Sequence, residues 1–192
     1  MIHETFHFIG IGGIGMSGLA HILLQRGAKV SGSDITANYM TEALKKNGAQ
    51  IFIGHNSANV ASSETVVFTS DISQENPELI EAIRKKCTVL HRSDLLLALM
   101  EGKFQLAVTG THGKTTTSSL LAHVLRVANL DPAFAVGGII PAYSTNASHG
   151  SGDYFVVEAD ESDATFLKYP YYGAIVTNID NDHIAHYGSM DA

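Results

Sequence analysis

Residues 104–129 read FQLAVTGTHGKTTTSSLLAHVLRVAN, and this stretch decides the fold of the chain. It opens on an apolar run, Leu106-Ala107-Val108, that predicts a buried strand. It closes on residues 119–127, where apolar side chains recur at helical spacing. Between them lies Gly110-Thr-His-Gly-Lys-Thr-Thr-Thr117. A strand, a glycine-rich turn and Gly-Lys-Thr at a helix start are typical of a phosphate-binding loop, in which backbone N–H groups and the helix N-terminus surround an anion.

The loop assigns roles to its side chains. Lys114 would reach the β- and γ-phosphates of a nucleotide, and the Thr115 hydroxyl would sit on Mg²⁺. The spacing G-x-x-G-K-T is shorter than the general G-x-x-x-x-G-K-[ST], which would place a glycine where Val108 stands. The alternative is a threonine-capped helix start without a ligand, and the flanking strand and helix favour the phosphate loop. The predicted ATP-binding residues are Gly110, Thr111, His112, Gly113, Lys114, Thr115 and Thr116.

A second glycine turn lies near the N-terminus. Residues 6–11 read as a short apolar strand, and the glycines at its end fit G-x-G-x-x-G (Gly10, Gly12, Gly15). A helix is predicted from about Met16 to Arg26, and the next strand ends at Asp34. Asp34 follows the glycines by about the 20 residues expected for a ribose-binding carboxylate. Taken alone, residues 5–34 predict a nicotinamide-dinucleotide site.

Predicted strands and helices keep alternating as far as residue 100. Further strands are expected at 50–53, 65–69 and 88–90, and further helices at 39–47, from Asn76-Pro77 onward, and at 94–100. In the helix after Pro77, Leu79, Ile80 and Ile83 are expected to face inward, and Ser93 is expected to cap the last helix. Such alternation predicts a parallel sheet with ligands at the carboxyl ends of its strands.

Glu101-Gly102-Lys103 marks the predicted boundary between two domains, 1–102 and 103–192. Beyond the phosphate loop, strands are expected at 133–136, 154–157 and 174–177, with 137–152 as a loop rich in Gly, Ser and Asn. Polar clusters follow the last two strands, at 158–163 and 178–183. Carboxylates beside a phosphate loop suggest a magnesium site. Glu158 is the first candidate ligand, with His183 as a further one, while supporting roles are expected for Asp160, Glu161 and Asp163.

The composition narrows the class of protein. The chain is 45% hydrophobic and 16% charged, as expected for a soluble globular protein with a core. The formal net charge of −7 and the lack of a basic block argue against nucleic-acid binding. No apolar run approaches the length of about 18 residues needed to span a membrane. The N-terminus lacks a signal-peptide pattern, and the single cysteine, Cys87, cannot form an internal disulfide, so we expect a cytoplasmic protein.

Together these motifs resemble a known family. The loop Gly110–Thr117 and the clusters Glu158–Asp163 and Asn178–His183 look like the ATP-binding motifs of the Mur ligases. Gly10–Gly18 and Ser31–Asp34 narrow the resemblance to the branch that joins L-alanine to UDP-N-acetylmuramate. The branch that recycles murein tripeptide is the alternative. It differs in the first glycine loop and tends to have Tyr in place of Ser162.

The resemblance implies the fold and the ligand of each domain. It implies a Rossmann-like parallel-sheet domain at the N-terminus, followed by part of a P-loop-type ATP-binding α/β domain. In this family the first glycine loop holds the diphosphate of a UDP-sugar and not a nicotinamide cofactor. The residues expected to contact UDP-N-acetylmuramate are Gly12, Gly13, Ile14, Gly15, Met16, Ser33, Asp34, Ser70, His91 and Arg92.

The resemblance also implies the reaction, a step of peptidoglycan precursor synthesis. ATP would phosphorylate the muramoyl carboxylate, and the amine of L-alanine would attack the acyl phosphate. The implied catalytic residues are Lys114, Glu158 and His183, with Thr115, Glu158 and His183 as Mg²⁺ ligands. Family members have three domains, and this sequence stops at Ala192 inside the expected central one. We therefore expect a fragment that is inactive alone.

Two other classes of function compete with a ligase. An NAD-dependent dehydrogenase explains residues 5–34 but leaves Lys114 and Glu158 without a role. A nucleotide-binding module without catalysis is the third class, and it can describe this fragment even if the parent protein is a ligase.

Overall fold

A computed structural model describes residues 4–60, 65–159 and 168–180 of the chain. The chain splits into two compact units, Met1–Ala98 and Leu99–Ala192. The boundary predicted at Glu101-Gly102-Lys103 lies shortly after this division. The family resemblance and the βα alternation both predicted an α/β chain, and both units have that class of fold.

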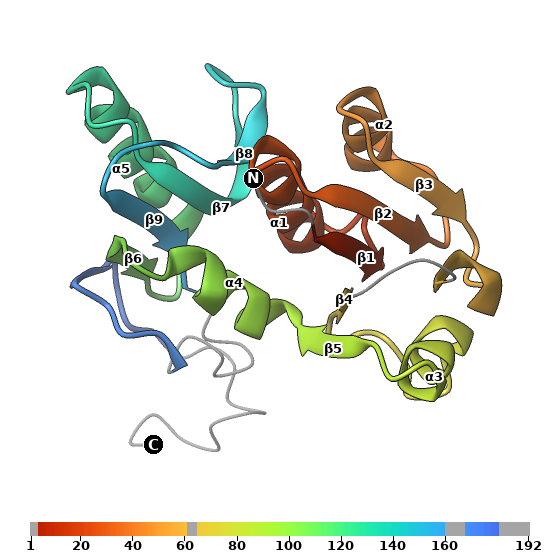
Figure 1. Ribbon diagram of the computed structural model, residues 1–192. Coiled ribbons are helices and arrows are strands. Elements are labelled where there is room, and N and C mark those ends of the chain that lie inside the picture. Colours follow the sequence, from red (N-terminus) through yellow and green to blue (C-terminus); the bar gives the residue numbers. More distant parts are fainter. Residues whose placement is uncertain (1–3, 61–64, 160–167, 181–192) are drawn as a thin grey trace. The chain divides into compact units, whose positions relative to one another are not determined.

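The first unit is built on a parallel sheet (Figure 1). Its elements are β1 (Thr5–Ile9), α1 (Ile14–Gln25), β2 (Lys29–Asp34), α2 (Tyr39–Lys46), β3 (Gln50–Ile53), the 3-10 helix η1 (Ser57–Val60), β4 (Thr65–Phe68), α3 (Pro77–Arg84), β5 (Thr88–His91) and α4 (Arg92–Met100), which reaches the division between the units. The five strands lie in the order β3-β2-β1-β4-β5, all parallel. The order changes direction between β1 and β4, and open α/β sheets bind ligands at such a point.

In helix α3, the local sequence sets where the helix begins, and packing sets which face is buried. It begins at Pro77, and the Asn76 side chain caps it by accepting from the N–H groups of Glu78 and Leu79, as the Asn-Pro pair predicted. Leu79 is buried in a cluster with Ile9, Val60, Val66 and Ala82. However, the inward orientation predicted for Ile80 and Ile83 is wrong, since they are 52% and 62% exposed. Ala82 takes the inward position, because residues three apart share a helix face.

The start of α4 also differs from prediction. The helix begins at Arg92, so Ser93 lies inside its first turn and is not the cap. The Ser93 hydroxyl instead lies 2.8 Å from Nδ1 of His91, the last residue of β5.

The second unit carries the phosphate loop. Its elements are β6 (Phe104–Thr109), α5 (Lys114–Val127), β7 (Ala133–Ile140), β8 (Thr145–Ser148), β9 (Tyr154–Glu158) and β10 (Gly173–Val176). The strand order is β10-β6-β9-β7-β8, with β8 antiparallel to β7 and the other pairs parallel. Strand β6 therefore lies between the two strands whose ends were predicted to carry the polar clusters.

The prediction of a loop at 137–152 is partly wrong. Strand β7 continues to Ile140, and β8 returns beside it as a hairpin. In the sequence, Gly137 and Gly138 look like loop residues. In the structure they belong to β7, which runs so close to Glu158 and Thr115 that it leaves no room for side chains at these two positions. A Cβ on Gly138 would lie 2.9 Å from Cγ2 of Thr115, and one on Gly137 would lie 2.7 Å from Oε1 of Glu158.

Helix α5 packs on this second sheet. Its Ala122 joins Phe134, Val136, Ile140 and Val156 in a buried cluster, which Leu121 and Leu125 also contact. Leu120 and Val124, which share the apolar spacing of the helix, are 59% and 53% exposed. None of the helices in the described ranges is long and apolar enough to cross a membrane.

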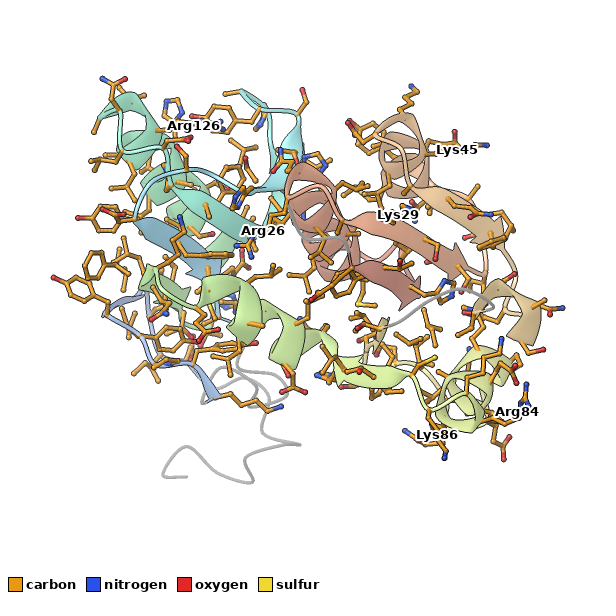
Figure 2. All side chains as sticks on the ribbon, in the orientation of Figure 1. Arg26, Lys29, Lys45, Arg84, Lys86 and Arg126 are labelled. Carbon is orange, nitrogen blue, oxygen red and sulfur yellow. The ribbon has the colours of Figure 1, made fainter. Side chains whose placement is uncertain are left out.

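Three helices carry basic side chains in their last turns. Figure 2 labels Lys45, Arg84 and Arg126, which lie in the last turns of α2, α3 and α5. Positive charge there complements the negative end of the helix dipole. Arg126 is roughly 20 Å from the glycine turn along the axis of α5, at about 1.5 Å per residue. Lys114, in the first turn, is the basic residue of α5 that lies at the turn.

Candidate functional site

The turn between β6 and α5 has the backbone that an anion-binding loop requires. Gly110 and Gly113 have φ of 122° and 83°, a region that L side chains rarely adopt. Gly113 occupies the N-cap position of α5 without a side-chain cap, and the first turn carries no acidic residue. The first turn of α5 therefore adds no negative charge of its own at the positive end of the helix dipole, which suits a bound phosphate.

Lys114 is folded over this loop. Its Nζ donates to the carbonyl oxygens of Gly110 at 2.7 Å and Thr111 at 3.3 Å. The lysine charge thus lies beside the turn, and its contact with nucleotide phosphates stays a prediction.

Glu158 is fixed next to the start of α5. It is the last residue of β9 and pairs with Val108 of β6, so the strand register brings it to the loop. The Thr115 hydroxyl donates to Oε1 of Glu158 at 2.9 Å. Oε2 accepts from the Ser118 hydroxyl at 3.3 Å and from the Gly137 N–H at 2.6 Å. Three donors from α5 and β7 hold one carboxylate in place.

The Thr115 hydroxyl and the Glu158 carboxylate fit a magnesium ion. Mg²⁺ takes oxygen ligands and keeps several waters, so one carboxylate with phosphate oxygens suffices. Among the described residues no three His, Cys, Asp or Glu side chains cluster as a metal cage would require. His183, predicted as a ligand of a second Mg²⁺, lies outside the described residues, as do Asp160, Glu161 and Asp163.

The glycine turn of the first unit is held by the end of β2. The Gly12 N–H donates to Oδ2 of Asp34 at 2.8 Å, and the Gly12 carbonyl accepts from Nδ2 of Asn38 at 3.1 Å. The N–H of Gly12 points to Asp34, so it is not positioned to donate to a diphosphate. We therefore assign Asp34 to holding the turn. The Gly13 N–H is also taken, since it donates to the Gly10 carbonyl at 3.2 Å, so we expect the N–H groups from Ile14 to Met16 to face the ligand.

Helix α1 starts as α5 does, at a glycine without a side-chain cap and without an acidic residue in its first turn. Arg92 lies beside this start, since a Cβ on Gly15 would be 3.6 Å from Nη1 of Arg92. Ser70 and His91 form a second pair after β4 and at the end of β5, with Oγ and Nε2 3.0 Å apart. A guanidinium next to an uncapped helix N-terminus suits a diphosphate.

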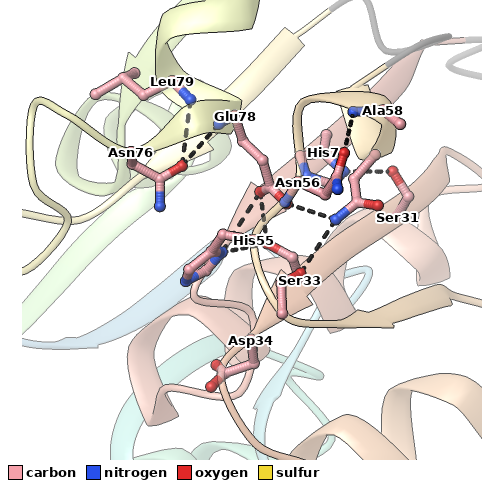
Figure 3. A network of polar contacts seen from close by, with 12 residues as sticks. His7, Ser31, Ser33, Asp34, His55, Asn56, Ala58, Asn76, Glu78 and Leu79 are labelled. Carbon is pink, nitrogen blue, oxygen red and sulfur yellow. Dashed lines mark hydrogen bonds and ion pairs between the residues drawn. The ribbon is translucent and has the colours of Figure 1, made fainter.

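Ser33 does not fit its predicted role. Its side chain is buried, its hydroxyl donates to Oε2 of Glu78 at 2.5 Å, and it lies 2.9 Å from Nδ1 of His55 (Figure 3). A direct contact between this side chain and the nucleotide is not supported, because the side chain points into the protein. Alternation along β2 leaves Asp34 on the other face of the strand.

The comparison with known proteins tests the resemblance to a family. The model of the “Mur ligase family, catalytic domain” matches residues 5–104, and that of the “Mur ligase middle domain” matches residues 108–192. The chain belongs to the Mur ligase family. The first match includes the glycine fingerprint that alone predicted a dinucleotide, so a dehydrogenase is not favoured.

Relatives of this Mur ligase include proteins named UDP-N-acetylmuramate–L-alanine ligase. That of Protochlamydia amoebophila is 62% identical over 97% of this chain and 41% of the relative. That of Methylorubrum populi is 53% identical over 97% of this chain and 40% of the relative. The chain thus spans about two fifths of the length of these relatives.

Solved structures of Mur ligases share the fold. UDP-N-acetylmuramate–alanine ligase MurC of Thermotoga maritima is 35% identical, with a TM-score of 0.89 over 97% of this chain and 44% of that chain. The UDP-N-acetylmuramate:L-alanyl-γ-D-glutamyl-meso-diaminopimelate ligase of Neisseria meningitides is 28% identical, with a TM-score of 0.85 over 99% of this chain and 64% of that chain.

Several residues at the two sites of this Mur ligase were not found from the sequence. They are Ser118 and Gly137, which hold Glu158, and Asn38, which holds the first glycine turn. Asn178 was predicted as part of a polar cluster, but its bonds to the second glycine turn were not. The Gly137-Gly138 pair at the end of a predicted strand was a usable signal, because glycine within a strand often marks the close approach of another group.

Proposed function

We propose that this Mur ligase joins L-alanine to UDP-N-acetylmuramate with ATP, a step of peptidoglycan precursor synthesis in the cytoplasm. The observation that carries the proposal is the pairing of Thr115 with Glu158 beside Lys114, at a glycine turn that opens an uncapped helix. The names of the relatives at 62% and 53% identity support the choice of substrates.

The proposed chemistry is the reaction that the family resemblance implies. The γ-phosphoryl group of ATP passes to the muramoyl carboxylate, which leaves ADP and an acyl phosphate. The L-alanine amine then attacks the acyl carbon, loses a proton and displaces phosphate. Lys114 stabilises negative charge on the transferring phosphoryl group from its place over the loop. Thr115 and Glu158 would hold Mg²⁺, which would neutralise phosphate charge, and His183 is proposed to hold a second ion.

The first unit provides the site for the sugar nucleotide. The start of α1 and the guanidinium of Arg92 receive the diphosphate, while Asp34 and Asn38 keep the turn in shape. Ser70 and His91, at the carboxyl ends of neighbouring strands, complete the proposed contacts.

An assay of product formation tests the proposal. The full-length protein is incubated with ATP, MgCl₂, UDP-N-acetylmuramate and either L-alanine or L-alanyl-γ-D-glutamyl-meso-diaminopimelate, and the products are identified by mass spectrometry. We expect UDP-N-acetylmuramoyl-L-alanine and equimolar ADP. Product with the tripeptide alone would make this a recycling ligase, to which the fold is also similar. Binding of NAD in preference to UDP-N-acetylmuramate would overturn the assignment of the first unit.

A further inference from the structure

The phosphate loop is contacted by the residues that follow β10. The His112 N–H donates to Oδ1 of Asn178 at 2.9 Å, and Nδ2 of Asn178 donates to the His112 carbonyl at 2.9 Å. A single amide side chain therefore satisfies both backbone groups of one loop residue. The Thr177 hydroxyl adds a bond to the same carbonyl at 2.6 Å.

Backbone contacts make the same connection. The Thr111 N–H donates to the Asn178 carbonyl at 3.2 Å, and the Asp180 N–H donates to the Thr111 hydroxyl at 3.0 Å. There is no room for a side chain between the two segments, since a Cβ on Gly110 would lie 2.3 Å from Oγ1 of Thr177 and 2.7 Å from the Asn178 carbonyl oxygen. Residues 177–180 thus clasp residues 110–112.

The clasp changes the role expected of His112. Its N–H points to Asn178, so this residue is not positioned to donate its backbone N–H to a phosphate. An anion cradle depends on the fixed orientation of successive N–H groups, and a glycine-rich turn has many other conformations. A side chain that fixes one peptide in the turn reduces the entropy lost when the anion binds.

We propose that Asn178 is a positioning residue that presets the phosphate loop for ATP through the His112 peptide. The inference rests on the proposed function, because it takes this loop as the ATP site. The first unit carries the same device: the two backbone groups of Gly12 are bonded to Asp34 and Asn38, at and after the end of the strand next to β1. In each unit, side chains from a neighbouring strand end hold both sides of one residue in the glycine turn.

Two substitutions of Asn178 test the role by titration with ATP–Mg²⁺ and, separately, with UDP-N-acetylmuramate. Asn178→Ala removes both amide bonds and should raise the Kd for ATP about tenfold, which corresponds to about 1.4 kcal/mol. Asn178→Asp keeps the acceptor for the His112 N–H, loses the donor and brings negative charge to the loop. Its ATP affinity should fall at least as far. Affinity for UDP-N-acetylmuramate should stay unchanged in both variants.

The matched control is Asn47→Ala. The Asn47 amide makes a comparable exposed bond to the Ala43 carbonyl at 2.8 Å, at the end of α2, and its loss should change neither affinity. Unchanged ATP affinity in both Asn178 variants, or an equal loss for both ligands, would overturn the proposal.

Hydrogen exchange of the His112 N–H gives a second readout without ATP. Exchange at this amide should become on the order of tenfold faster in Asn178→Ala, because the bond that protects it is removed. An unchanged rate would show that the clasp does not form. If the unmutated protein bound no ATP, the proposed function would fail, whereas the exchange rates would still decide whether Asn178 orders the loop.

Discussion

Loss of the Glu78 carboxylate should destabilise the first unit. Its carboxylate is buried at the start of α3 (Figure 3). It lies 3.1 Å from Nε2 of His7 and accepts from the Ser33 hydroxyl at 2.5 Å, Nδ2 of Asn59 at 2.6 Å and the Asn56 N–H at 3.1 Å. Burial acts to raise the pKa of Glu78, but these four groups outweigh it and lower the pKa from 4.5 to about 2.

The pKa gives the size of the effect. At about 1.4 kcal/mol per pH unit, the ionised carboxylate contributes roughly 3 kcal/mol to the free energy of unfolding. Because the pKa is lower in the folded state, this contribution is complete above the unfolded pKa near 4.5 and is lost as the pH falls toward 2. Glu78→Gln keeps the shape but replaces an acceptor with an NH₂ donor among donors. We expect it to lower the free energy of unfolding by about 3 kcal/mol at pH 7.

Amide hydrogen exchange in β1 and β2 measures this stability in the first unit by itself. The matched control is Glu81→Gln on the same helix. The hydrogen bond from Arg84 leads the causes that lower the pKa of Glu81 to about 2, but the Arg84 side chain is 69% exposed, and surface ion pairs contribute little to stability. The difference in the free energy of unfolding between Glu78→Gln and the unmutated protein should be smaller at pH 3 than at pH 7. The reasoning is refuted if Glu78→Gln lowers the free energy of unfolding no more than Glu81→Gln does. It is also refuted if the loss caused by Glu78→Gln does not depend on pH.

Three further substitutions test the two ligand sites. In calorimetric titrations, Gly15→Val should raise the Kd for UDP-N-acetylmuramate about tenfold and leave ATP binding unchanged. The fold can accept the substitution, because a Cβ at this position meets only Nη1 of Arg92, at 3.6 Å. Equal loss of affinity for both ligands would contradict this prediction. Glu158→Gln should raise the Mg²⁺ concentration for half-maximal activity about 100-fold and depress turnover, because an amide is a poorer ligand than a carboxylate. Ser118→Ala should raise that concentration only about tenfold in the same magnesium titration, since Glu158 keeps its bonds to Thr115 and Gly137. Identical curves for the last two would remove Glu158 as the ligand.

Much of the fold was predictable because its signals are local. The Asn76-Pro77 pair predicted the start of α3, and Asn76 does cap it. Short apolar runs separated by helical spacing predicted the parallel sheets. The errors arose where a choice depends on what packs against a segment. Ile80 and Leu79 are similar in hydrophobicity, and only their contacts show that one is exposed and the other buried.

For the site residues too, the predictions failed where a role depends on which groups a side chain contacts. The Asp34 carboxylate was predicted to contact a ligand from its distance in sequence, whereas in the structure it bonds to the backbone of Gly12. Ser33, its neighbour, was predicted to line the same site and is buried against Glu78. Adjacent strand residues point to opposite faces, and the sequence does not state which face the nucleotide would use.

The sequence by itself determined the phosphate loop. Glycines that allow positive φ, and a Lys-Thr pair that opens a helix, lie within eight residues, so the turn can be recognised from chain neighbours alone. Only the tertiary structure decided the partners of that loop. Thr115 meets Glu158 across 43 residues and His112 meets Asn178 across 66, because β9 and β10 pair with the two edges of β6. Hydrogen bonds between strands define that order. The strands have similar local sequence patterns, so these patterns do not predict which strands pair.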